Sequence, residues 1–454
     1  MSNTIKSINP YNQELIETYT LETETQVFSK LKMADKAFND WKNEDIEHRT
    51  QLLINVGNIL EERLEPLSKL ITLEMGKPIQ ESRAEINKCI FLCDFYTTNA
   101  EEFLADQIIK TDAQESFISY DPLGVILAIM PWNFPFWQVL RFAIPTLAAG
   151  NTVVVKHASN VTGCALALQT IFEDAGFNPG CFQTLVTNHK VIEKVLEDPI
   201  VKAVSLTGSE KAGRSIAKVA GQHLKKAVLE LGGNNACIVL DDANLNKYID
   251  TIVKARMLNT GQSCIAAKRF IVTENIYDAF VDKFTAKVKT LKYSNPLNEE
   301  TEIATLARED LATDIQKQVD DAIQKGAKVV LGNQRDKAYF APTILTEVTK
   351  DMAVFTEETF GPVAPIFKVK NIEEALELAT NSKFGLGTML FTEDTETATE
   401  HISKIPDGAF FINEMVKSDP RLPFGGTKAS GYGRELSVEG IHEFVNVKTV
   451  YINK

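Results

Sequence analysis

From about residue 122 onward, short runs of β-branched residues alternate with amphipathic segments, and this pattern constrains the fold more than any other. Residues 25–105 instead carry apolar side chains at three- and four-residue steps, which predicts helices. Strands that alternate with helices at this spacing form parallel sheets that are covered on both faces. The sequence therefore predicts an α/β fold that begins with a helical region.

The strand candidates fall into two sets, which indicates two α/β domains. The set before residue 264 comprises 124–130, 151–158, 182–187, 201–208, 226–233 and 235–240, with helices expected at 160–175 and 210–221. The set after it comprises strands at 269–274, 327–332, 340–348, 363–369, 387–392 and 408–413, with helices at 275–290, 309–325, 371–380 and 394–403.

Two segments fit neither set. Residues 107–122 are typical of a polar hairpin, and residues 445–454 of a terminal strand. An unpaired edge strand is a liability, so we expect these segments to pair with another subunit in a homodimer or homotetramer.

Composition and charge exclude several classes of function. With 454 residues and a net charge of −13, the chain would be repelled by nucleic acids and anionic membranes. No apolar run reaches the length of a membrane helix, and no signal-peptide pattern is visible. Six cysteines are too sparse for a disulfide framework and favour the cytoplasm. The close pair Cys89 and Cys93 lacks a matching pair at zinc spacing, so no metal is expected.

Cys264, in the stretch "LNTGQSCIAAKR", is a candidate nucleophile. A thiolate is a strong nucleophile, and the preceding turn could direct backbone N–H groups toward it. A lone cysteine is more often a small buried residue, so this interpretation depends on chemical partners elsewhere in the chain.

Two other segments supply such partners. Asn133 lies between two prolines in "PWNFP", where a fixed carboxamide can donate to a developing oxyanion. Its alternative role is to cap its own backbone in a turn. Glu230 ends a predicted strand ahead of the glycines of "LELGG", which suits a general base. Its alternative role is a helix cap or a salt bridge.

The stretch "SLTGSEKAGRS" nearly matches a nucleotide-triphosphate loop through Gly208 and Gly213. Arg214 replaces the lysine of that motif, and no acidic strand for magnesium follows, which argues against a triphosphatase. A strand, a Gly-Ser turn and a helix start can still hold a phosphate of a dinucleotide.

Six motifs, in this order, resemble the NAD(P)-dependent aldehyde dehydrogenase superfamily: "PWNFP", "LTGSEKAG", "LELGG", "GQSC", "EETFGPV" and "PFGGTKASGYGRE". Their surroundings are most similar to the shorter bacterial succinate-semialdehyde dehydrogenases. The resemblance implies a Rossmann-like dinucleotide-binding domain at 1–106 and 123–232, and a catalytic domain at 233–431. It also implies a small β oligomerisation segment at 107–122 and 440–454.

The resemblance implies a mechanism as well. Cys264 would attack the aldehyde to form a thiohemiacetal, and the Asn133 amide and the Cys264 N–H would stabilise the oxyanion. Loss of hydride to the nicotinamide would leave a thioester, and Glu230 would activate the water that hydrolyses it. An electropositive site lined by N–H groups would favour the thiolate without a histidine.

The same resemblance implies that eight residues bind the cofactor: Trp132, Lys156, Ser159, Gly208, Ser209, Gly213, Glu358 and Phe360. Many NAD-preferring members carry a glutamate where Ser159 stands, and a carboxylate there would repel a 2′-phosphate. Serine together with Lys156 would accept that phosphate, so we expect NADP in preference to NAD.

The expected substrate is succinate semialdehyde, whose distal carboxylate requires a positive partner. Arg141 and Ser418 match the residues that bind this carboxylate in the resembling enzymes, although a structural ion pair is the alternative role of Arg141. Leu258 stands where many longer relatives carry a second arginine. Arg256 is expected to point elsewhere, and Arg421 is a further candidate.

Other functions remain open at this point. The chain could be a general aliphatic aldehyde dehydrogenase, or a coenzyme A-acylating enzyme, which needs no glutamate base. A binding protein without activity is disfavoured by the joint presence of Cys264, Glu230 and Asn133. A cysteine hydrolase is disfavoured because no histidine motif accompanies the cysteine.

Overall fold

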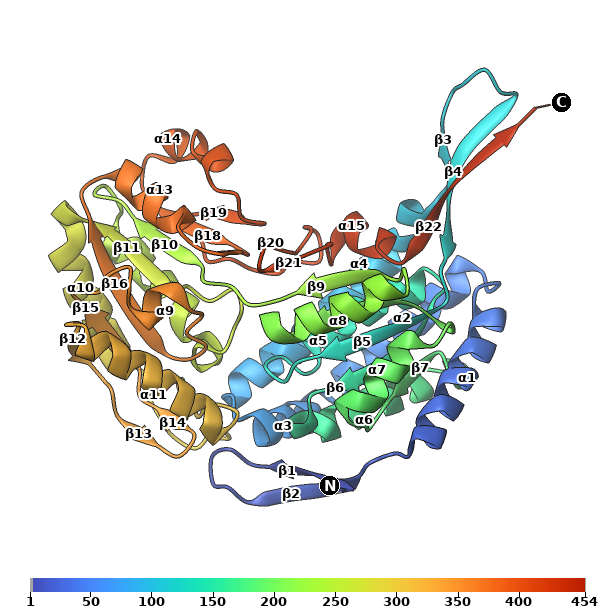
Figure 1. Cartoon of the computed structure of the whole chain (residues 1–454), viewed down its shortest axis with the longest axis horizontal. Coiled ribbons are helices and arrows are strands. Elements are labelled where there is room, and N and C mark those ends of the chain that lie inside the picture. The colour runs from blue at the N-terminus through green and yellow to red at the C-terminus, as the bar shows by residue number, and fades with distance from the viewer. Residues whose placement is uncertain (1–2, 454) are drawn as a thin grey trace.

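The computed structural model describes residues 3–453, which fold around two central sheets in separate lobes (Figure 1). The first sheet has six strands in the order β21-β9-β8-β5-β6-β7, all parallel except β21. Its strands are β5 (Val125–Met130), β6 (Thr152–His157), β7 (Phe182–Thr184), β8 (Val201–Thr207), β9 (Lys226–Glu230) and β21 (Gly431–Tyr432).

Helices cover both faces of this sheet because successive residues of a strand point to opposite sides. On β5, Ile126 and Ala128 belong to the core shared with α2 to α6, whereas Val125 and Leu127 belong to the core shared with α1, α7 and α8. The helices are α1 (Glu24–Trp41), α2 (Ile46–Glu62), α3 (Leu64–Met75), α4 (Ile79–Leu104), α5 (Trp137–Ala148), α6 (Thr162–Asp174), α7 (His189–Glu197) and α8 (Glu210–Gln222).

The second sheet has seven strands in the order β12-β15-β16-β11-β10-β18-β19, all parallel except β12. Its strands are β10 (Ala236–Val239), β11 (Arg269–Thr273), β12 (Lys328–Leu331), β15 (Thr343–Thr346), β16 (Val363–Val369), β18 (Thr388–Phe391) and β19 (Phe410–Ile412). Its helices are α9 (Leu245–Met257), α10 (Glu274–Lys289), α11 (Glu309–Gln324), α12 (Ala353–Thr356), α13 (Ile372–Thr380) and α14 (Thr395–Thr399). The two sheets confirm the predicted α/β class.

A three-stranded arm projects from the first lobe and carries the C-terminal strand (Figure 1). Its strands are β3 (Gln107–Ile108), β4 (Glu115–Pro122) and β22 (Val445–Ile452). β22 pairs antiparallel with the whole of β4, from Val445 opposite Pro122 to Ile452 opposite Glu115. The two segments that fit neither set of strands therefore lie together in one sheet.

Smaller elements complete the chain. They are β1 (Thr4–Ile8), β2 (Leu15–Thr20), β13 (Arg335–Asp336), β14 (Tyr339–Phe340), β17 (Phe384–Gly385), β20 (Thr427–Lys428), α15 (Ser437–His442) and the 3₁₀ turns η1 (Ser159–Val161), η2 (Leu258–Gly261) and η3 (Ile402–Lys404). The β1–β2 hairpin was not expected from the sequence. Strand 235–240 was grouped with the first set, but β10 lies inside the second sheet, so that grouping was wrong.

Within residues 3–453, no helix is long and apolar enough to cross a membrane. All six cysteines are free thiols. No group of three or more potential metal ligands occurs in the same described part of the chain.

Candidate active site

The loop that carries Cys264 has an unusual backbone. Asn259, Thr260 and Gly261 adopt positive φ angles of 55°, 53° and 75°, a conformation that costs energy for residues with a Cβ atom. Side chains hold it in place: the Asn259 amide donates to the Asn133 carbonyl oxygen at 2.8 Å, and the Thr260 hydroxyl accepts from the Ala304 N–H at 3.1 Å. The loop is therefore fixed to the segment that contains Asn133.

The glycines of "LELGG" make room for two parts of this site. A Cβ atom on Gly232 would lie 2.3 Å from a carboxylate oxygen of Glu358. A Cβ atom on Gly233 would lie 2.6 Å from the Cys264 carbonyl oxygen. These close approaches explain why side chains are absent at both positions.

Cys264 lies where two cavities meet, because it lines both. The first, which we name the Trp132 cavity, contains several residues predicted to bind the cofactor or to catalyse: Trp132, Asn133, Gly208, Ser209, Glu358 and Phe360. The second, which we name the Arg141 cavity, contains both residues predicted to bind the substrate carboxylate, Arg141 and Ser418. The residues predicted to bind the substrate carboxylate and several of those predicted to bind the cofactor therefore line different cavities, with Cys264 in both.

The Trp132 cavity opens at the carboxyl ends of strands in the first sheet, where ligands bind in open α/β sheets. Ser209 is the N-cap of α8 and lines the cavity, so the N-terminal end of this helix lies at its wall, an arrangement that suits a phosphate. Trp132 and Phe360 meet edge to face with ring centroids 5.7 Å apart. Glu358 is held by the Lys268 ammonium at 2.7 Å and by the Gly233 N–H at 3.2 Å.

Three of the predicted cofactor residues line neither cavity. Lys156 is buried near the end of β6, and burial lowers the pKa of its ammonium to about 8. Ser159 lies at the start of η1. Gly213 packs inside α8, where a Cβ atom would lie 2.6 Å from a methyl carbon of Leu231, so its observed contact is helix packing. Their part in cofactor binding stays a prediction.

Glu230 ends β9 and is buried, and neither carboxylate oxygen has a hydrogen-bond partner in the described part of the chain. Burial first, and the nearby charge of Glu435 second, raise the pKa of Glu230 well above its usual range. A raised pKa makes the ionised carboxylate a stronger base, which suits a group that takes a proton from water.

The Asn133 side chain is also buried, and its amide donates to the Gln262 carbonyl oxygen at 3.1 Å, two residues before the cysteine. The predicted donor therefore lies next to the nucleophile, where one of its N–H groups binds the loop backbone.

The predicted electropositive environment of the thiol is only partly present. Burial raises the pKa of the Cys264 thiol to about 11. Arg141 and Lys268 lower it, whereas Glu358 and Glu230 raise it. Burial outweighs the nearby cations, so the expectation that the site favours the thiolate stays a prediction.

The structure shows the ion pair that was the alternative role of Arg141, and its substrate-binding role stays a prediction. This residue lines the Arg141 cavity, and it also forms a buried ion pair with Glu435, a residue of the "GYGRE" motif whose role the sequence did not reveal. Arg256 points elsewhere, as expected, donating to the carbonyl oxygens of Ala267 and Thr359.

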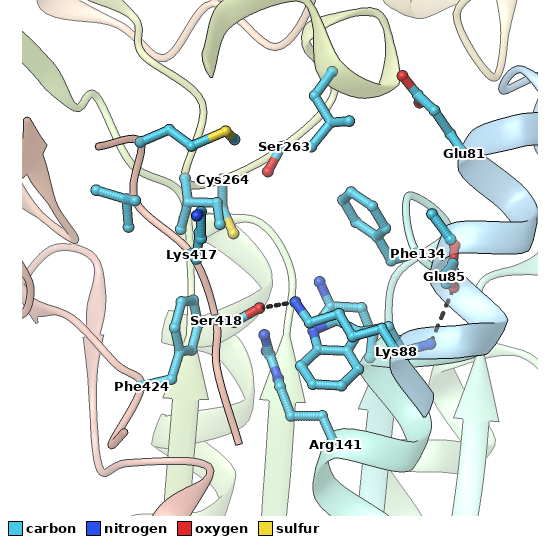
Figure 2. A pocket seen from close by; sticks show the side chains of 17 residues that line it. Glu81, Glu85, Lys88, Phe134, Arg141, Ser263, Cys264, Lys417, Ser418 and Phe424 are labelled. Atoms are coloured by element: carbon cyan, nitrogen blue, oxygen red, sulfur yellow. Dashed lines mark hydrogen bonds between the residues drawn. The ribbon is translucent and has the colours of Figure 1, made fainter. Parts of the chain in front are cut away.

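Arg421 pairs with Asp419 through an exposed side chain and does not line the Arg141 cavity. Leu258 does line it, as an apolar residue. A cation that the sequence analysis missed, Lys88 of α4, lies in this cavity and donates to the Ser418 hydroxyl at 2.6 Å (Figure 2). Nothing in the periodicity of α4 distinguishes Lys88 from a surface lysine.

Comparisons with known proteins agree with this geometry. The sequence matches the aldehyde dehydrogenase family over residues 1–450. It is 48% identical over 451 residues to a probable succinate-semialdehyde dehydrogenase [NADP(+)] of Synechocystis sp., covering 99% of both chains. It is 45% identical to succinate-semialdehyde dehydrogenase [NADP(+)] 1 of Mycobacterium tuberculosis, again covering 99% of both.

Among solved structures, the fold is similar to the succinic semialdehyde dehydrogenase of Streptococcus pyogenes in complex with NADP+. The TM-score is 0.97 and the sequence identity 37%, covering 99% of this chain and 100% of that one. The family resemblance and the fold predicted from the six motifs are thereby confirmed. The chain belongs to the aldehyde dehydrogenase family.

Proposed function

We propose that this protein oxidises succinate semialdehyde to succinate with NADP+ as the hydride acceptor. The observation that carries the proposal is the position of Cys264 between the Trp132 cavity and the cation-bearing Arg141 cavity. The relatives named above, which are succinate-semialdehyde dehydrogenases with NADP in their names, support both the substrate and the cofactor.

Cys264 is the proposed nucleophile. Its thiolate sulfur forms a bond to the aldehyde carbon, and the carbonyl oxygen becomes an oxyanion. One N–H of the Asn133 amide donates to the Gln262 carbonyl oxygen at 3.1 Å, and the second N–H would donate to that oxyanion together with the Cys264 N–H. Donors that are fixed before the reaction stabilise the developing charge without reorganisation.

The residues of the Trp132 cavity fit a dinucleotide. The α8 N-terminus and Gly208 suit a pyrophosphate, the Trp132 and Phe360 rings offer apolar walls, and Glu358 offers a carboxylate to ribose hydroxyls. The chemistry that NADP+ would supply here is acceptance of the hydride lost from the former aldehyde carbon, after which the C=O bond re-forms and Cys264 carries the acyl group as a thioester. For the 2′-phosphate we propose Lys156 and Ser159. His189, at the start of α7, is a further neighbour, since the charge of Lys156 lowers its pKa.

Glu230 is the proposed base for hydrolysis. It takes a proton from water, whose oxygen attacks the thioester carbon, and the C–S bond breaks to release succinate and the thiolate. Its buried, unpaired carboxylate favours this route over acyl transfer to coenzyme A, which would need no base here.

An aldehyde panel with NADP+ and NAD+ tests the proposal. We expect succinate semialdehyde with NADP+ to give the highest kcat/KM, and Cys264→Ala to abolish reduction of either cofactor. A neutral aldehyde of equal length that reacts as well would contradict the substrate, and coenzyme A-dependent product formation would contradict hydrolysis.

We also propose a cytoplasmic homo-oligomer that assembles through the β3–β4–β22 arm. The arm exposes several apolar side chains: Ile108, Ile109, Val447, Tyr451 and Ile452. Such an apolar edge supports pairing with a second copy. Light scattering after size-exclusion chromatography should give a dimer or tetramer mass, and a monomer at micromolar concentration would contradict this assembly.

A further inference from the structure

One ammonium group in the Arg141 cavity has no carboxylate partner among the residues that the structure describes. Lys88 projects from α4, and its Nζ atom donates to the Ser418 hydroxyl at 2.6 Å. The same atom lies over the Trp137 ring, 3.9 Å from its centroid. In Figure 2 the nitrogen ends of Lys88 and Arg141 and the sulfur of Cys264 all face the space beside Ser418.

The other charged groups of this cavity are matched except Glu81, whose carboxylate accepts the Asn259 N–H at 2.8 Å and forms no ion pair within residues 3–453. Arg141 pairs with Glu435, and Lys417 pairs with Glu414. The carboxylate of Glu85 is engaged elsewhere. It binds Lys77 at 2.6 Å and accepts the N–H groups that begin α5.

Lys88 itself forms no ion pair within residues 3–453; its contacts are the Ser418 hydroxyl and the Trp137 ring. Burial, with a contribution from the charge of Arg141, lowers the pKa of this ammonium to about 8. A desolvated cation without a counterion favours the binding of an anion.

We propose that Lys88 binds the distal carboxylate of the semialdehyde, with the Ser418 hydroxyl as its neighbouring donor. This inference rests on the proposed function and names the cation that the substrate's charge requires. Arg141 contributes less free charge because Glu435 already neutralises it. Ser418 accepts from Lys88, so its own O–H remains able to donate to the same carboxylate.

The surroundings of Lys88 fix its position before substrate arrives. Trp137 holds the ammonium by a cation–π contact and Ser418 by a hydrogen bond, so little side-chain freedom is lost on binding. Leu258, on the same cavity wall, offers only apolar contact to the methylene groups of a substrate.

Charge removal at this position tests the inference. We expect Lys88→Met to raise KM for succinate semialdehyde and to lower its kcat/KM by about 10-fold or more, the loss expected for a hydrogen bond to a charged group. Its kcat/KM for butanal, the neutral aldehyde of equal length, should stay within about twofold, which also shows that the variant folds. Lys88→Arg should restore most of the preference.

Lys42→Met is a matched control. Lys42 also lies over an aromatic ring, with its Nζ atom 5.2 Å from the centroid of Phe38, but it does not line the Arg141 cavity. This control should leave kcat/KM unchanged for both succinate semialdehyde and butanal. Succinate as a competitive inhibitor of butanal oxidation gives a second readout, and its inhibition constant should rise by a similar factor in Lys88→Met.

The outcomes separate the two proposals. If the wild-type enzyme prefers succinate semialdehyde to butanal and Lys88→Met keeps that preference, Lys88 does not bind the carboxylate and the proposed function stands. If the wild-type enzyme shows no preference, the proposed substrate fails, and the inference about Lys88 fails with it.

Discussion

Gly233 and Cys264 lie so close that a Cβ atom on the glycine would come within 2.6 Å of the Cys264 carbonyl oxygen. The contact joins the segment that follows β9 to the loop that carries the proposed nucleophile, Cys264. The proposed base, Glu230, is the last residue of β9. Backbone packing at Gly233 therefore constrains the position of the Cys264 loop.

Gly233→Ala should displace the Cys264 backbone and lower kcat/KM by about 100-fold, the loss typical of a misplaced catalytic group. Gly221→Ala is the matched control, because a Cβ atom at this position of α8 would meet nothing within 4 Å. That control should keep full activity and gain about 0.5–1 kcal/mol of unfolding free energy. Equal activity of both variants would show that the contact does not position the thiol.

The raised pKa of Cys264, about 11, predicts how the free enzyme reacts with iodoacetamide. Only the thiolate is alkylated, and the thiol loses its proton as pH rises toward the pKa. The alkylation rate at this residue should therefore increase by roughly tenfold per pH unit between about pH 7 and 10. Site-resolved mass spectrometry measures this rate, and a plateau near neutral pH would indicate a thiolate already formed.

Ser159→Glu should turn the cofactor preference toward NAD+. A carboxylate at this position, close in sequence to the buried Lys156, would repel a 2′-phosphate and tolerate a 2′-hydroxyl. We expect KM for NADP+ to rise by about 10-fold or more, with KM for NAD+ nearly unchanged. Ser159→Ala separates loss of the hydroxyl from addition of charge. An unchanged ratio of kcat/KM values would place the 2′-phosphate elsewhere.

The preference for succinate semialdehyde over butanal should decline as pH rises through about 8. Lys88 carries its charge below this pKa and loses it above, so attraction for a carboxylate is present at low pH and lost at high pH. The charge of Arg141 lowers this pKa, whereas Cys89, Glu85 and Asp419 raise it. Taking the ratio of the two kcat/KM values cancels the ionisation of the shared thiol. Burial raises the pKa of Glu81, in the same cavity, to about 7, so its ionisation adds a second decline at lower pH. Lys88→Arg should remove the decline centred near pH 8 and leave that of Glu81, and a wild-type ratio that does not change near pH 8 would argue against the assignment.

The sequence predicted the two sheets because most of their strands are short, apolar and β-branched, as in "VILAIM" of β5. The β1–β2 hairpin was missed because its strands are polar and largely exposed, so they lack the pattern of a buried strand. Strand 235–240 was grouped with the wrong set because periodicity does not show which sheet a strand joins.

The site residues that belong to sequence motifs could be predicted. A residue that only the fold brings to the site could not. Cys264, Asn133 and Glu230 were predicted from their motifs. The structure brings the first two to one cavity, whereas Glu230 lines neither cavity and its role stays a prediction. Lys88 was missed because it lies 330 residues from Ser418 in sequence, on a helix that nothing marks as functional. The pKa of the thiol could not be predicted, because it depends first on burial and then on charged groups from distant segments.

The most direct test of the proposed mechanism uses Glu230→Gln with succinate semialdehyde and NADP+. Intact-protein and peptide mass spectrometry after rapid quenching should find one succinyl group on Cys264, together with a single turnover of NADPH and little free succinate. Such an acyl-enzyme would show that the thiol accepts the acyl group and that Glu230 is needed to release it. Multiple turnovers at the wild-type rate, or an acyl group on another residue, would contradict the mechanism.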